Sequence, residues 1–183
     1  MAMKEIVFDE HKFRELVLYI ADRCQDDPRF GATKLNKILF YADFLHYGES
    51  GTPLTGATYR KLEHGPAPKQ LLPTQTKLVS DGSAALSKRE RYGYVQKRIV
   101  ALREPDLSSF SGEDIALVDA VIRAFADNNA WETSQISHRE LGWQQAGLME
   151  DIPYFAVFLS SAPLTAGDIE RGQKVAAEHG LLR

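Results

Sequence analysis

The chain has 183 residues, 44% of them hydrophobic, and its 22 basic and 25 acidic residues leave a net charge of −3. This size and apolar content suffice for one well-buried core. The near balance of charge argues against a protein whose main task is to grip a phosphate backbone, although a local basic patch is compatible with it. The single cysteine excludes an internal disulfide. With no signal peptide and no membrane-spanning apolar run in the sequence, we expect a cytoplasmic protein without membrane association.

The first helix is predicted from Asp9 to about Cys24. Its apolar residues recur at helical spacing, Asp9 is a candidate N-cap, and the Asp26-Asp27-Pro28 segment breaks the pattern. The residues that share this stripe are Phe13, Leu16, Val17, Ile20 and Cys24. The thiol is therefore expected to be buried.

A second amphipathic helix is predicted from Lys34, with Thr33 as its N-cap and Gly48 and Gly51 at its end. Its apolar face consists of Leu35, Ile38, Leu39, Ala42 and Leu45. Lys34 and Lys37 lie at the positive end of the helix dipole, an unfavourable place for cations. Two interpretations stay open: solvated lysines outside the core, or a basic surface that meets an acidic partner. Asn36 lies between them, off the apolar face.

The middle of the chain mixes strands with one helix. Ala57 to Leu62 is typical of a half-exposed strand, and Tyr94 to Leu102 of a second one. A helix is expected from Pro68 to about Ser80, with Pro73 as a local disturbance. The Gly65-Pro66 pair between them is interpreted as a turn device, because glycine permits a positive φ and proline directs the next segment.

The C-terminal third is predicted to be mainly helical. Ser111 and Asp114 form a capping-box pattern before a helix that runs to Phe125, and a shorter helix spans Thr133 to Arg139. Ile152 to Leu159 favours an extended segment over a helix. A last helix is expected over about residues 165–179. The sum is an α+β fold: one mostly helical domain over residues 1–183, with five or six helices around a small antiparallel sheet.

No catalytic site, metal site or cofactor is expected. The histidines His46, His64 and His138 lie in no known ligand spacing, and no nucleophile elbow or phosphate-cradling loop is present. His46 and His64 are expected to form hydrogen bonds across the junction between the second helix and the first strand. His138 is expected to pack beside Trp143, with contact to a partner as the alternative.

A basic run extends from Lys88 to Arg103. Its six cations are Lys88, Arg89, Arg91, Lys97, Arg98 and Arg103, against the single acid Glu90. Three interpretations compete: a track for nucleic acid, lysines and arginines that solvate an edge strand, and an electrostatic contact with a protein partner.

Two blocks of sequence carry a family pattern. The first is Lys34-Leu35-Asn36-Lys37, then Phe40-Tyr41-Ala42-Asp43, a glycine-containing turn, and a short strand ending at Gly65-Pro66. The second is Leu102-Arg103-Glu104-Pro105-Asp106-Leu107, a capped helix, and Ser134 to Trp143 with the core Ser137-His138-Arg139-Glu140. Together they resemble the Panacea domain of SocA-type antitoxins and of numerous phage-associated proteins. The resemblance covers roughly residues 10 to 160.

The resemblance implies a non-catalytic antitoxin that binds and neutralises a protein toxin, in some relatives by delivering it to a cellular protease. The candidate partner-binding residues are Lys34, Asn36, Lys37, Tyr41, Tyr47, Tyr59, Arg60 and Lys61; the structural signature is Asp43, His46, Gly65, Pro66, His138 and Trp143. The alternative is a DNA-binding transcriptional regulator of its own operon, motivated by the basic run. Nucleic acid is the less favoured partner. The sequence leaves the identity of the toxin and the oligomeric state open.

Overall fold

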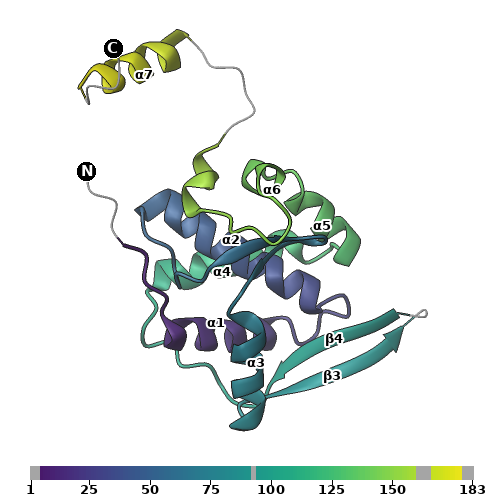
Figure 1. The fold of residues 1–183 in the computed structure, drawn as a ribbon. Helices are drawn as coiled ribbons and strands as arrows, with labels where there is room; N and C mark the ends of the chain where they lie inside the picture. The colour runs from purple at the N-terminus through teal and green to yellow at the C-terminus, as the bar shows by residue number, and fades with distance from the viewer. Residues whose placement is uncertain (1–4, 92–93, 160–165, 179–183) are drawn as a thin grey trace.

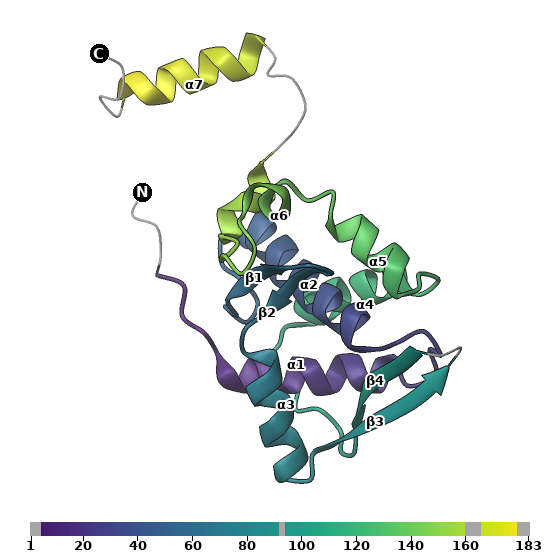
Figure 2. The same ribbon diagram turned by 45° about the vertical axis from the view of Figure 1, so that its right-hand side comes forward.

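The structure is a computed structural model that describes residues 5–91, 94–159 and 166–178. It confirms the α+β prediction (Figures 1 and 2). Within those residues lie seven α-helices, one 3₁₀ helix and two antiparallel sheets of two strands each, where five or six helices and one sheet were expected. None of the described helices is long and apolar enough to cross a membrane.

Helix α2 (Ala32–Ser50) is the central element, and α1, α4, α5, β2, β4 and the 3₁₀ helix all pack against it. Helix α1 (Glu10–Arg23) begins at the predicted cap, where Asp9 accepts a hydrogen bond from the amide of Lys12 at 2.9 Å. Helix α4 (Gly112–Phe125) begins at the predicted capping box of Ser111 and Asp114. The core lies between these helices because their apolar stripes face each other. Its members include Phe13, Leu16, Ile20, Leu35, Ile38, Leu39, Val118 and Phe125.

Two details of these helices differ from the predictions. Helix α2 begins two residues earlier than expected, with Gly31 as N-cap, so Thr33 lies inside the first turn. Of the two glycines predicted at its end, Gly51 adopts a left-handed φ of 74° and closes the helix, whereas Gly48 lies within the helix. Cys24, at the end of α1, is buried as expected, and burial raises the pKa of its thiol to about 11.

The first sheet pairs β1 (Tyr59–Leu62) with β2 (Gly65–Pro68). Strand β2 was not predicted: the expected helix begins only at α3 (Leu71–Ser80), because residues 65–68 pair with β1. The second sheet pairs β3 (Ala84–Arg91) with β4 (Tyr94–Ala101) in a hairpin that projects from the body (Figure 2). Strand β3 was also missed, since its sequence, AALSKRER, shows no sustained alternation of apolar and polar residues.

The C-terminal part contains three short elements and one longer helix. Helix α5 (Ala130–Ser137) begins at an Asn129 cap, earlier than the predicted Thr133, and α6 (Leu141–Gln145) follows. Tyr154–Phe158 is a 3₁₀ helix, η1, so the extended prediction for this segment is wrong. Helix α7 (Ala166–Glu178) lies apart from the body in both views (Figures 1 and 2), and its predicted cap, Thr165, falls outside the described residues.

Candidate functional site

Lys34 and Lys37 lie inside the protein, with exposed fractions of 2% and 1%. The Lys34 ammonium donates to Asp27 Oδ2 at 2.7 Å and to the carbonyl oxygen of Ala126 at 3.3 Å. The Lys37 ammonium donates to the carbonyl oxygen of Pro66 at 3.1 Å, and burial lowers its pKa to about 7. The expectation that both lysines are exposed is therefore wrong. Each long side chain instead reaches an internal acceptor, which a buried cation requires.

Asp43 is the centre of a second buried polar network. Its Oδ1 accepts from the amide of Thr55 at 2.6 Å, and its Oδ2 accepts from the hydroxyls of Thr55 and Tyr59 at 2.6 and 2.7 Å. Burial raises the pKa of the Asp43 carboxyl, while the bonds from Thr55 and Tyr59 act in the opposite direction. Tyr59 is 1% exposed, so it holds Asp43 and has no surface to offer as a partner anchor, contrary to expectation.

Gly65 has a φ of 97°, in the left-handed region that favours glycine. A Cβ at this position would overlap Ser137 Oγ and would lie 2.6 Å from Lys37 Cε. The next residue, Pro66, supplies the acceptor for Lys37. The residues Lys34, Lys37, Asp43, Tyr59, Gly65 and Pro66 are called the signature cluster below. They interlock helix α2 with the first sheet and with α5.

The His138 ring stacks on Trp143, with ring centroids 4.0 Å apart and an interplanar angle of 12°. The Lys61 ammonium lies over the Trp143 ring, 4.3 Å from the ring centroid. It also donates to the carbonyl oxygen of Ala146 at 3.0 Å. Lys61 therefore fastens β1 to the end of α6. His138 packs beside Trp143 as the sequence favoured, and burial lowers the pKa of its imidazole.

His46 ties the end of α2 to the start of α4. Its Nδ1 donates to the carbonyl oxygen of Thr52 at 2.6 Å, and its Nε2 lies 3.1 Å from Asp114 Oδ1. His64 contributes its main-chain carbonyl, which accepts from the Ser134 hydroxyl at 3.1 Å. In the part of the chain that the structure describes, no group of three His, Cys, Asp or Glu side chains is arranged to hold a metal ion.

The remaining partner-binding candidates are half-buried. The Tyr41 hydroxyl donates to Glu140 Oε1 at 2.7 Å, and the Tyr47 ring packs against Tyr154 with centroids 5.5 Å apart. Asn36 and Arg60 are also half-buried. A partner-binding role for these four residues stays a prediction.

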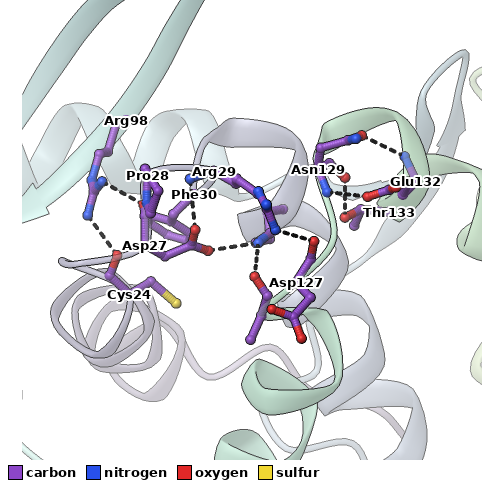
Figure 3. Close-up of polar contacts among 12 residues, drawn as sticks. Cys24, Asp27, Pro28, Arg29, Phe30, Arg98, Asp127, Asn129, Glu132 and Thr133 are labelled. Atoms are coloured by element: carbon purple, nitrogen blue, oxygen red, sulfur yellow. Dashed lines mark hydrogen bonds and ion pairs between the residues drawn. The ribbon is translucent and has the colours of Figure 1, made fainter.

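The basic run does not form one continuous charged surface. The Arg98 guanidinium is buried and donates to the carbonyl oxygens of Cys24 at 2.7 Å and Asp27 at 3.0 Å (Figure 3). Arg103 forms a two-pronged ion pair with Glu15, at 2.6 and 2.8 Å. Of the six cations in the run, these two therefore serve internal contacts.

A groove of about 820 Å³ opens where the start of α2, strand β4 and the start of α5 meet. We call it the α2–α5 groove. It is lined by Pro28, Arg29, Gly31, Ala32, Thr33, Lys34, Val95, Gln96, Lys97, Asn129, Ala130 and Trp131. Two of its side chains are large, apolar and solvent-exposed: Trp131 of α5 is 69% exposed and Val95 of β4 is 62% exposed.

Polar contacts around the groove fix its walls. Gln96 Nε2 donates to the carbonyl oxygens of Pro28 and Phe30, at 3.3 and 2.9 Å, and so holds β4 beside the loop that precedes α2. The Arg29 guanidinium donates to the carbonyl oxygen of Asp127, which joins the same loop to the segment before α5 (Figure 3). The walls are thus cross-linked by side chains from segments that are far apart in the sequence.

The lining of the groove is cationic and contains no carboxylate; its charged members are Arg29, Lys34 and Lys97. Helix α2 begins here with no side-chain cap and no acid in its first turn, whereas Asn129 caps α5 by accepting from the amides of Trp131 and Glu132. The uncapped amides and the positive end of the α2 dipole therefore face a groove whose lining residues include no Asp or Glu.

Sequence reasoning missed this groove. Trp131 lay just outside the predicted helix, and Val95 was assigned to a strand without regard to its exposure. One signal was available in the sequence: Asn129 and Glu132 fit a capping-box pattern, which places Trp131 in the first turn of a helix.

In comparisons with known proteins, no curated protein and no solved structure matches the chain. The family described as "Antitoxin SocA-like, Panacea domain" matches residues 35–144. The match contains most of the signature cluster and the helices that pack on it. The chain therefore belongs to the SocA-like antitoxin family and contains a Panacea domain.

Proposed function

We propose that the chain is the antitoxin of a toxin–antitoxin pair and that it neutralises a protein toxin in the cytoplasm by binding directly to it. The observation that carries the proposal is the family match over residues 35–144. The activity proposed is binding and not catalysis.

The distribution of side chains supports a scaffold that presents a surface. The signature cluster forms internal hydrogen bonds that hold α2, the first sheet and α5 together. The exposed apolar side chains of the α2–α5 groove are not needed for that packing, and exposed apolar surface rimmed by charge is typical of protein interfaces. A toxin that covers the groove and its surroundings would bury about 1,600 Å² in total.

Co-expression with the neighbouring reading frame of the operon tests the proposal. We expect that frame to arrest growth when expressed alone, the pair to restore growth, and a tagged antitoxin to copurify with the toxin at a fixed ratio. A neighbour that is harmless in several hosts removes the main support for the proposal.

Neutralisation by binding and neutralisation by delivery to a cellular protease give different results in the same strains. Direct occlusion leaves the amount of toxin unchanged, and rescue persists in a host that lacks the major cytoplasmic proteases. An adaptor mechanism lowers the amount of toxin and fails in that host. We propose direct occlusion.

The alternative, a DNA-binding regulator of the same operon, has less support. Arg98 is buried and bonded to main-chain carbonyls, and Arg103 is paired with Glu15, which reduces the basic run to a partial patch. A gel shift on the operon's own promoter at low salt, where phosphate contacts are strongest, tests this alternative. We expect no shift.

A further inference from the structure

We propose that the α2–α5 groove binds an acidic segment of the toxin that carries one large apolar side chain. The inference rests on the proposed function for the identity of the partner. The chemistry of the partner is inferred from the groove itself, in three steps.

The apolar part of the ligand follows from Trp131 and Val95. Both are exposed in the free chain, and both line the same groove from different elements. An aromatic or branched aliphatic side chain that enters between them removes apolar surface of both residues from water, and tryptophan is one of the residue types enriched at the energetic centre of interfaces.

The acidic part follows from the electrostatics of the lining. Arg29 and Lys97 contribute positive charge, and the amides of Ala32, Thr33 and Lys34 open α2 without a side-chain cap. The two carboxylates bonded to lining residues already have partners: Asp27 accepts from the Lys34 ammonium and the amide of Arg29, at 2.7 Å each, and Glu132 accepts from the amide of Asn129 at 2.7 Å. Carboxylates of a partner are therefore complementary to the groove.

A protein segment fits these features better than nucleic acid. The lining is mainly apolar, the chain has a net charge of −3, and Arg98 donates to carbonyl oxygens beneath β4 instead of extending the basic surface. A phosphate backbone would require an extended cationic track. Binding of a DNA duplex is accordingly one of the outcomes that overturn the proposal.

The binding test uses the full chain and three fluorescein-labelled peptides of about twelve residues. The first has one central phenylalanine flanked by aspartates and glutamates, the second has lysines in place of the acids, and the third has serine in place of phenylalanine. We expect the first to bind about tenfold more tightly than either comparison, with weaker binding at about 300 mM than at about 50 mM salt. Equal affinities for the three peptides, or tighter binding of a DNA duplex, overturn the proposal.

Two variants locate the site. Trp131→Ala removes the apolar wall, and Ala32→Glu places a carboxylate at the first turn of α2. The second variant is diagnostic because an acid at a helix N-terminus stabilises the helix while it repels an acidic ligand. We expect each to weaken binding of the acidic phenylalanine peptide by about tenfold or more, with Ala32→Glu melting at or above the wild-type temperature.

Leu72→Glu is the matched control. Leu72 is 72% exposed, lies in the first turn of α3 and is not part of the groove, so it receives the same charge at the same kind of position. We expect its affinity for the peptide to equal that of the wild type. An equal loss of affinity in Leu72→Glu and Ala32→Glu, or wild-type affinity in Ala32→Glu, overturns the proposal.

The same variants in the co-expression assay separate the two proposals. If the wild type rescues growth and Ala32→Glu does not, both proposals are supported. Rescue by both folded groove variants leaves the antitoxin function standing and overturns the groove as the toxin's docking site. If the neighbouring frame is harmless, the antitoxin proposal fails while the peptide measurements still decide the chemistry of the groove.

Discussion

The Lys37 ammonium donates to the carbonyl oxygen of Pro66 at 3.1 Å, and both groups are buried. This bond joins the two ends of the sequence signature, from the start of α2 to the second strand of the first sheet. The signature therefore describes how the domain is held together. Its buried members, such as Lys37 and Tyr59, have no surface to offer to a partner.

The buried lysine makes stability depend on pH. The pKa of Lys37 is about 7 in the folded state, against 10.5 for an ordinary lysine. Between these pH values the unfolded chain binds more protons than the folded chain. The contribution of Lys37 to stability therefore rises with pH across that window and falls as pH decreases toward 7. We expect the wild type to gain about 1 kcal/mol per pH unit between about pH 7.5 and 9.5 relative to Lys37→Met. Urea denaturation measures the difference. Lys88→Met, at an exposed lysine, should show no such trend, and a flat difference for Lys37→Met would contradict the expected pKa.

Gly65→Ala should be strongly destabilising. The added methyl group overlaps Ser137 Oγ and crowds Lys37 Cε, on a backbone already at a φ of 97°. We expect a loss of roughly 3 kcal/mol or more in the free energy of unfolding. Gly51→Ala is the matched control: its φ is 74°, but nothing lies within 4 Å of the added carbon, so only about 1 kcal/mol of backbone strain is expected. Equal losses would show that backbone strain, and not the contact with Ser137, determines the cost.

Asp43→Asn tests the second buried network. The carboxylate accepts from one amide and two hydroxyls, and the NH₂ group of asparagine would face at least one of these donors. We expect the free energy of unfolding to fall by about 2–4 kcal/mol. Asp151→Asn, which removes a carboxylate from the exposed ion pair with Lys69, should change it by less than about 1 kcal/mol. Urea denaturation of the two variants measures both losses. Similar losses in the free energy of unfolding would contradict the role of Asp43 as the centre of a buried network.

Cys24 should be inert in the native state. The thiol is buried, and burial raises its pKa to about 11, so the reactive thiolate is scarce at neutral pH. We expect an aromatic disulfide reagent to react slowly with the folded protein and rapidly in denaturant, with the native rate following global unfolding. A rapid native reaction would instead indicate local opening at the end of α1.

The helices could be predicted from sequence because their signals are local. The caps at Asp9 and at Ser111 and Asp114 need only neighbouring residues and are present as expected. The prediction of an extended conformation for Ile152 to Leu159 was wrong because an apolar run this short has no decisive period. The 3₁₀ geometry of this segment depends on packing against α2.

The positions of the lysines could not be predicted because most of their partners are distant. Periodicity treats Lys34 and Lys37 as polar and therefore as surface residues. Lys34, however, reaches Ala126 as well as the nearby Asp27, and Lys37 reaches Pro66. The α2–α5 groove was beyond reach for the same reason. It exists only where three elements from residues 28–34, 95–97 and 129–131 meet.

Because the chain is synthesised from its N-terminus, the long-range contacts of the signature cluster can form only after their C-terminal partners have been made. Lys34 leaves the ribosome long before Ala126, and Gly65 long before Ser137, which closes over it. A nascent chain that stops within α4 lacks both Ala126, an acceptor for Lys34, and Ser137, which covers the first sheet at Gly65. Incomplete translation products are therefore expected to remain unfolded and open to proteolysis, so that only finished chains accumulate.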